Sequence, residues 1–166
     1  MRRIVVLVLL VVAVGGVLLW MRSGSDEELI RAQLTRLAAA VSVPEGGANP
    51  LVRGAKMRGE FAAIFDEDVR ANVPEFPSEL PNKRSELADT ATQLSSLYPS
   101  LSVELVDIVV KLDDAKQSAH VGATAKLQAQ GRGGHASKDS RAVDFLFNKH
   151  DGTWRIASVT VWAKGE

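Results

Sequence analysis

Few side chains of this chain are suited to moving a proton. Asp144 lies inside the strand-like segment VDFLF, on the face that it shares with Ala142 and Leu146. If that face lines a pocket, burial raises the pKa of the carboxyl group and suits it to general acid or base catalysis. The alternative is a face turned to solvent or to a second subunit. Asp144 is therefore a candidate catalytic residue with both roles open.

Three further residues are candidates for a site. His120 begins a strand-like segment beside small residues, and Thr124 and Lys126 share its polar face. Tyr98 follows the third predicted helix, so its hydroxyl group either enters a pocket or stays in water while the ring packs. Asp107 interrupts a hydrophobic strand. It is expected on a ligand or partner surface, or else as an outward carboxylate or as a cross-strand partner of Lys126.

Metal binding and nucleophilic catalysis have little support in the sequence. His120, His135 and His150 are widely separated, and no His-x-x-His spacing occurs. The acidic segment FDEDVR lacks the alternating oxygen ligands and central glycine of a calcium loop. Cysteine is absent, which excludes disulfides, thiolate zinc sites and cysteine nucleophiles. No Gly-x-Ser-x-Gly elbow occurs either. We predict no metal site and no cofactor.

The stretch HDGTWRI, residues 150–156, has two interpretations. His150 beside Asp151 resembles half of an acid/base pair, but Asp-Gly between two alternating segments is also a strong signal for a two-residue hairpin turn. The turn accounts for Asp151 and Gly152 because both of its central residues need positive φ. We therefore expect His150 at a rim rather than in a catalytic site.

Three amphipathic helices are expected to support these residues. Apolar residues recur at helical spacing from Asp26 to Val41, more weakly in LVRGAKMRGEFAAIF (51–65), and again from Lys83 to Leu97. Ser25 or Asp26 is expected to cap the first helix, and Asn82 or Ser85 the third.

The second half of the chain alternates with the period of β-strands. We expect strands in SLSVELVDIVVKL, AHVGATAKLQA, RAVDFLFN and TWRIASVTVWA, joined by a DDAK hairpin, a GRGGHASKDS loop and the Asp-Gly turn. On a regular first strand, Glu104 and Val106 share a face with Ile108. DEDVRANV is a short strand candidate. The prediction is an α+β domain of about three helices packed on a curved, four-stranded antiparallel meander.

This order of elements resembles the nuclear-transport-factor-2-like, or SnoaL-like, superfamily. The resemblance covers about residues 26–164 and rests on the DEELIRAQLTRLAAAV opening, the NKRSELADTATQL helix before LSVELVDIVV, and the DGTWRI ending. It implies a cystatin-like cone whose open end holds a small molecule. It also implies that an enzyme of this kind pairs an Asp with a His or Tyr. The superfamily includes isomerases, dehydratases, hydrolases, dimeric adaptors and secretion components, so the resemblance selects no single function.

The amino-terminal segment predicts a membrane anchor. No charged residue occurs from Ile4 to Trp20, and the exit lacks the small residues of a signal cleavage site. Arg2 and Arg3 outweigh Arg22, which predicts a cytoplasmic amino terminus. We expect residues 1–3 in the cytoplasm, a transmembrane signal anchor at 4–21, a linker at 22–25 and the domain at 26–166 outside the cytoplasm. That is the periplasm if the cell has an outer membrane. A cleaved secretory signal is the alternative to an uncleaved anchor.

The remaining composition and the tryptophans bear on partners. Without the three terminal arginines, acidic residues exceed basic ones by three, which disfavours nucleic-acid binding. Trp154 and Trp162 are separated by an even number of residues, so on a regular strand they share a face that forms either a partner surface or the core.

The leading hypothesis is a non-catalytic, membrane-anchored, extracytoplasmic binding or scaffold domain. Its expected partners are the membrane through residues 4–21, a protein or second copy on the sheet face, and a small apolar ligand. The alternatives are a small-molecule pocket enzyme that uses Asp144 with Tyr98 or His120, and a secretion-system-like envelope component.

Overall fold

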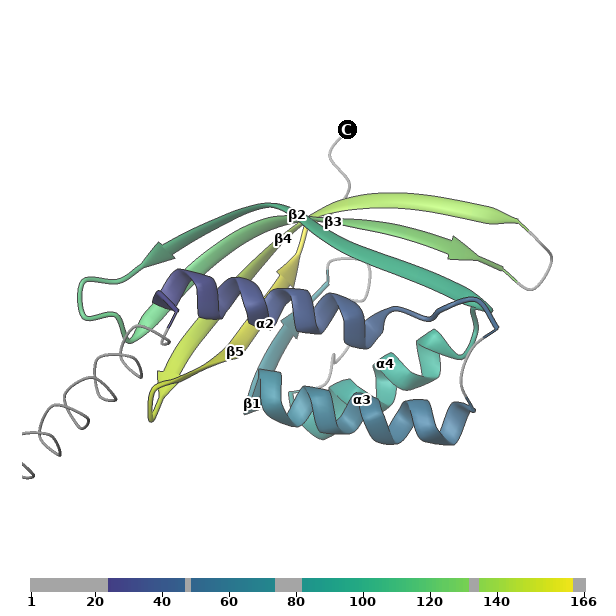
Figure 1. Ribbon diagram of the computed structural model, residues 1–166, viewed down its shortest axis with the longest axis horizontal. Helices are drawn as coiled ribbons and strands as arrows, with labels where there is room; N and C mark the ends of the chain where they lie inside the picture. Colours follow the sequence, from purple (N-terminus) through teal and green to yellow (C-terminus); the bar gives the residue numbers. More distant parts are fainter. Residues whose placement is uncertain (1–23, 47–48, 74–81, 132–134, 163–166) are drawn as a thin grey trace, which may run out of the picture.

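The structure is a computed structural model that describes residues 24–46, 49–73, 82–131 and 135–162 (Figure 1). The predicted transmembrane anchor at residues 4–21 lies outside the described residues. In the part of the chain that is described, no helix combines the length and apolar character that a membrane span requires.

Three helices lie close to the predicted bounds: α2 (Asp26–Val41), α3 (Pro50–Ile64) and α4 (Arg84–Ser95). Ser25, one of the two predicted caps, starts α2: its hydroxyl accepts the backbone N–H of Glu28, whose carboxylate accepts the N–H of Ser25, which makes a capping box. The predicted caps of the third helix, Asn82 and Ser85, are wrong. Its N-cap is Lys83, which makes no side-chain capping bond.

Five strands form one sheet: β1 (Phe65–Asn72), β2 (Ser100–Leu112), β3 (Ser118–Gln130), β4 (Ala136–His150) and β5 (Thr153–Val161). Their order is β1-β5-β4-β3-β2. The expected antiparallel meander of β2 to β5 is confirmed, but the sheet as a whole is mixed because β1 pairs in parallel with β5. β1 follows α3 without a loop and is the first strand in the sheet order. The short strand candidate DEDVRANV is therefore confirmed, and it lies at an edge of the sheet.

The predicted Asp-Gly hairpin turn is confirmed. Asp151 and Gly152 have φ angles of 49° and 79°, the positive values that a type I′ turn requires at both central positions. The turn between β2 and β3 is held differently, because the Asp113 carboxylate accepts the backbone N–H groups of Gln117 and Ser118. These acceptor contacts lower the pKa of Asp113 below its ordinary value, since they favour the ionised carboxylate.

A β-bulge in β2 overturns the predicted side-chain faces of this strand. In β2 the pairing passes from Val106 opposite Thr124 to Val109 opposite Gly122, and Asp107 has a φ of 53°. The extra residue reverses the alternation, so Ile108 no longer shares a face with Val106. Val109 is consequently exposed and Ile108 packs against the core.

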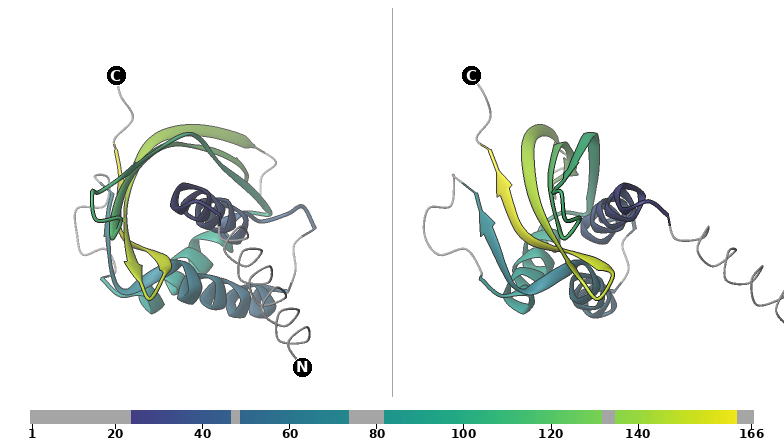
Figure 2. Two further views of the ribbon diagram at one scale, coloured as in Figure 1. Left: turned by 60° about the vertical axis from the view of Figure 1, so that its left-hand side comes forward. Right: turned by 90° about the vertical axis from the view of Figure 1, so that its left-hand side faces the viewer.

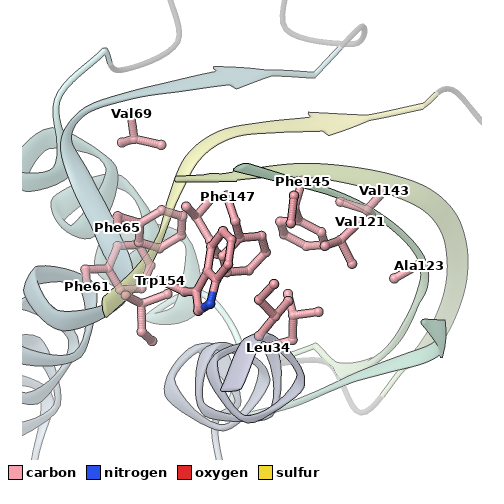
Figure 3. Close-up of a cluster of buried hydrophobic side chains, with 14 of the residues drawn as sticks. Leu34, Phe61, Phe65, Val69, Val121, Ala123, Val143, Phe145, Phe147 and Trp154 are labelled. Carbon is pink, nitrogen blue, oxygen red and sulfur yellow. The ribbon is translucent and has the colours of Figure 1, made fainter. Parts of the chain in front are cut away.

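The curved sheet wraps around α2, while α3 and α4 lie side by side below it (Figures 1 and 2). Leu34 of α2 meets Trp154, Phe147 and Val121 from the concave face of the sheet (Figure 3). Each of these four side chains is buried. Burial of this apolar surface is the main force that holds the layers together.

Candidate functional site

A cavity opens at the end of the fold where α2 ends and α3 begins, at the right of Figure 1. Its volume is about 810 Å³, which lies within the range of pockets that hold small ligands. Its described apolar lining residues come from both helices, the segment after α2 and the ends of β2, β3 and β4: Ala39, Ala40, Val43, Pro44, Val52, Met57, Leu101, Ala129 and Ala136.

One wall of this cavity is fixed to the sheet. Val43 donates to the Leu101 carbonyl at 2.6 Å and accepts from the Leu101 N–H at 2.9 Å, which ties the segment after α2 to the start of β2. The Ser42 hydroxyl donates to the Ala38 carbonyl and accepts the Val103 N–H. These bonds fix the segment after α2 against β2, and residues of this segment line the cavity.

The cavity also has a basic border. Arg53, Lys56 and Lys138 line it, against a single described acid, Glu45. Arg53, Lys56 and Met57 stand at positions i, i+3 and i+4 of α3, so they belong to the side of the helix that meets the cavity. The Arg53 Nε is buried and has no hydrogen-bond partner among the described residues.

The predicted acid/base residues do not line this cavity. Asp144 and His120 instead border a separate hollow of about 330 Å³ on the outer face of the sheet, over Gly122. The two residues stand on neighbouring strands, where Gly122 pairs with Asp144 and His120 pairs with Leu146. No hydrogen bond joins His120 to Asp144 among the described residues. Asp144 Oδ2 accepts from Trp162 Nε1 at 2.6 Å.

Tyr98 and Asp107 lie apart from both hollows. Tyr98 is in the exposed connection between α4 and β2 and lines neither. Asp107 is exposed in the β2 bulge. It does not face Lys126, whose cross-strand neighbour is Glu104. Of the alternatives expected for Asp107, the outward carboxylate agrees with this exposure, whereas the cross-strand pairing with Lys126 is wrong.

The prediction that Trp154 and Trp162 share one face is also wrong. Trp154 is 2% exposed and lies in the core, whereas Trp162 is 52% exposed. Between them the pairing of β4 with β5 passes from Phe147 opposite Ile156 to Leu146 opposite Ser158, which leaves Ala157 as an extra residue. This bulge turns Trp162 to the outer face. Trp154 therefore belongs to the core, and only Trp162 is available to a partner.

The narrow end of the fold, where α2 begins, is closed by a polar network. Asp26 Oδ1 accepts from Lys149 Nζ at 2.7 Å and from Trp154 Nε1 at 2.9 Å. Lys149 also lies over the Trp154 ring, 5.3 Å from its centroid. The hydrogen bonds from Lys149 and Trp154 lower the pKa of Asp26, because both stabilise the charged carboxylate.

The histidine of HDGTWRI is the last residue of β4. His150 Nε2 is 3.3 Å from Asp66 Oδ2 at the start of β1, and its side chain is exposed. Within the described ranges, no three His, Asp or Glu side chains gather in a group that could hold a metal ion.

Sequence reasoning missed the residues around the main cavity. Arg53, Lys56 and Met57 have the spacing of one helix face, which is the only local signal that they act together. The cavity itself has no local signal, because its walls come from two helices and three strand ends that are far apart in the sequence.

Comparison with known proteins identifies the fold. No family model matches the chain, and no curated protein matches it. Among solved structures, a nuclear transport factor 2-like superfamily protein from Salmonella enterica is 12% identical and has a TM-score of 0.65, covering 85% of this chain and 92% of that one. The Kfla4162 protein from Kribbella flavida has the same identity and coverages and a TM-score of 0.69.

A third similar structure is that of an enzyme. A type 2 hexachlorocyclohexane dehydrochlorinase is 9% identical, has a TM-score of 0.67, and is matched over 83% of this chain and 84% of that one. These likenesses show the fold alone. They confirm the predicted nuclear-transport-factor-2-like architecture of helices on a curved sheet.

Proposed function

We propose that this chain of nuclear-transport-factor-2-like fold is a non-catalytic binding domain that takes a small apolar molecule into the cavity bounded by α2, α3 and the strand ends. The single observation that carries the proposal is the cavity of about 810 Å³ with its aliphatic lining. None of the predicted acid/base residues Asp144, Tyr98 and His120 lines this cavity, whose described carboxylate is Glu45. The cavity therefore gives no support to the predicted Asp-based mechanism.

The sequence supports a location for this domain. The uncharged stretch from Ile4 to Trp20 has the length of a short membrane span. We therefore propose that residues 4–21 anchor the chain in the cell membrane, with the binding domain outside the cytoplasm. A tethered domain of this kind would meet ligands that leave or enter the bilayer.

The experiment is isolation of the full chain from its native membrane, followed by mass spectrometry of the small molecules that remain bound. Ala40→Leu adds bulk inside the cavity, and Ala55→Leu makes the same exchange on an exposed part of α3 that does not line it. We expect a bound apolar compound with the wild type and Ala55→Leu, and its loss with Ala40→Leu. Equal recovery from all three proteins would contradict binding in this cavity.

A specific observation also favours a protein partner on the outer face of the sheet. The Trp162 ring is half exposed and is oriented by its hydrogen bond to Asp144, and Val109 nearby on this face is exposed as well. Ordered aromatic side chains of this kind are common anchors at interfaces. A stable set of envelope proteins that co-purifies with the wild type and not with Trp162→Ala would support this role, including an envelope-assembly scaffold.

The rival enzyme hypothesis rests on Asp144 and His120, which border the same outer hollow. Both side chains are exposed, and the Asp144 carboxylate already accepts the Trp162 indole N–H. Incubation of the purified chain with its recovered ligand decides between the two hypotheses. Return of the ligand unchanged supports binding, whereas a product formed by the wild type and not by Asp144→Asn supports catalysis.

A further inference from the structure

The cavity combines aliphatic side chains with a cation at its border. Arg53 lines the cavity, and its Nε is one of three buried side-chain atoms without a hydrogen-bond partner among the described residues, beside Gln33 Oε1 and Arg155 Nε. The same residue makes no ion pair within the described ranges. Arg53 thus has unused capacity for an acceptor, and its planar guanidinium group favours an oxyanion.

The electrostatics of α3 point in the same direction. The helix begins at Pro50, its first turn contains no acidic residue, and Arg53 and Lys56 follow within its first two turns. The amino-terminal end of a helix carries partial positive charge, so these cations add to the helix dipole instead of offsetting it. The two cations and the helix dipole would both favour a bound anion over a neutral ligand.

The walls restrict the rest of the ligand. The apolar lining residues are alanine, valine, proline, leucine and methionine, beside serine and glutamine residues from the segment after α2 and from the strands, and no aromatic ring occurs among the described lining residues. The walls therefore offer no stacking surface for a flat aromatic body and suit an aliphatic chain instead.

We propose that the ligand of this cavity is an amphipathic anion with an aliphatic body, whose carboxylate or phosphate oxygens accept hydrogen bonds from Arg53, with Lys56 adding charge. This inference rests on the proposed binding function and specifies its ligand class. Two sources share this chemistry: a free aliphatic carboxylate in solution and an anionic phospholipid of the bilayer.

The test uses the full chain in phosphatidylcholine nanodiscs with labelled methionine methyl groups. The chain has three methionines, Met1, Met21 and Met57, and Met57 lines the cavity, so its methyl resonance reports occupancy. Octanoate and 1-octanol are titrated at free concentrations fixed by dialysis. They share one aliphatic chain and differ in charge. We expect octanoate to shift the Met57 resonance at a lower concentration than 1-octanol does.

Arg53→Gln removes the proposed anchor, and Arg58→Gln removes an equal charge from an exposed part of the same helix. Arg58 pairs with Asp89 at the surface and does not line the cavity. We expect Arg53→Gln to weaken octanoate binding about tenfold, the scale of one charge-assisted hydrogen bond, and to leave 1-octanol binding unchanged. Arg58→Gln should change neither, and Arg53→Lys should retain part of the octanoate affinity.

Other outcomes separate the two proposals. Equal binding of octanoate and 1-octanol, unaffected by Arg53→Gln, would overturn the anionic ligand and leave the binding cavity intact. A Met57 resonance that neither compound shifts would contradict both. Nanodiscs that contain phosphatidylglycerol distinguish the sources: an octanoate-like shift that Arg53→Gln abolishes identifies a lipid headgroup, and its absence together with octanoate binding identifies a free carboxylate.

Discussion

The two ends of α2 differ in how completely the groups around them are satisfied. At the amino-terminal end, Trp154 is buried and its indole N–H is bonded to Asp26, which Lys149 also contacts. At the carboxyl-terminal end, small side chains leave a cavity of about 810 Å³, and Arg53 has a buried donor without a described partner. One end is thus built for stability and the other has the features of a binding site, since a complete core leaves no room for a ligand.

The largest expected effect comes from the amino-terminal end of α2, where Trp154 is buried and which we call the closed end. Trp154→Ala removes a buried indole and should lower the free energy of unfolding by about 3 to 5 kcal/mol, because a large cavity replaces it. Trp162→Ala removes an exposed ring and should cost less than about 1 kcal/mol. Chemical denaturation of both variants measures the contrast, and equal losses would refute the assignment of the two tryptophans to opposite faces.

Asp26→Ala should have the next largest effect. The substitution leaves the indole N–H of Trp154 and the ammonium group of Lys149 without their common acceptor, which should cost about 2 kcal/mol in denaturation experiments. Asp89→Ala is the matched control, because the ion pair of Asp89 with Arg58 is exposed to solvent and should contribute less than about 1 kcal/mol to the free energy of unfolding. A control variant as unstable as Asp26→Ala would contradict a special role for the closed end.

The closed end should also depend on acid. The pKa of Asp26 in the folded chain lies below its ordinary value of 3.8, so its stabilising contribution is present above that value and is lost as pH falls through the folded pKa. The stability difference between wild type and Asp26→Asn should therefore be largest near neutral pH and shrink below the ordinary pKa. Asp113, whose pKa is also lowered, contributes equally to both proteins and cancels. A stability difference that stays constant with pH would contradict a stabilising role for the ionised Asp26 carboxylate.

The smallest effect on stability is expected at the carboxyl-terminal end of α2, where the cavity lies and which we call the open end. Ala40→Leu places a larger side chain beside empty space, so the free energy of unfolding should change by less than about 1 kcal/mol while ligand binding is lost. Thermal unfolding of the free protein checks the first part. A large destabilisation would mean that the cavity is already filled by the packed core.

Much of the fold follows from local patterns. The alternation of SLSVELVDIVVKL and the Asp151-Gly152 turn specify strands and a hairpin directly, and Ser25 with Glu28 specifies the start of α2. What alternation cannot specify is a single extra residue. The bulges at Asp107 and Ala157 reverse side-chain faces, and they depend on how the whole sheet bends around α2.

The site was less predictable than the fold for the same reason. Asp144 was correctly placed on a face shared with Ala142 and Leu146, but which side of the sheet that face would be depends on the packing of helices far away in sequence. The cavity beside Arg53 results from small side chains on separate elements, and no contiguous segment encodes it.

The binding cavity is tested by a titration of 1-octanol into the full chain in phosphatidylcholine nanodiscs, with the Met57 methyl group and the Trp154 indole N–H observed together. We expect a saturable shift of Met57 at the open end and an unchanged Trp154 resonance at the closed end. An unshifted Met57 resonance, or equal shifts at both positions, would contradict a binding cavity confined to the open end.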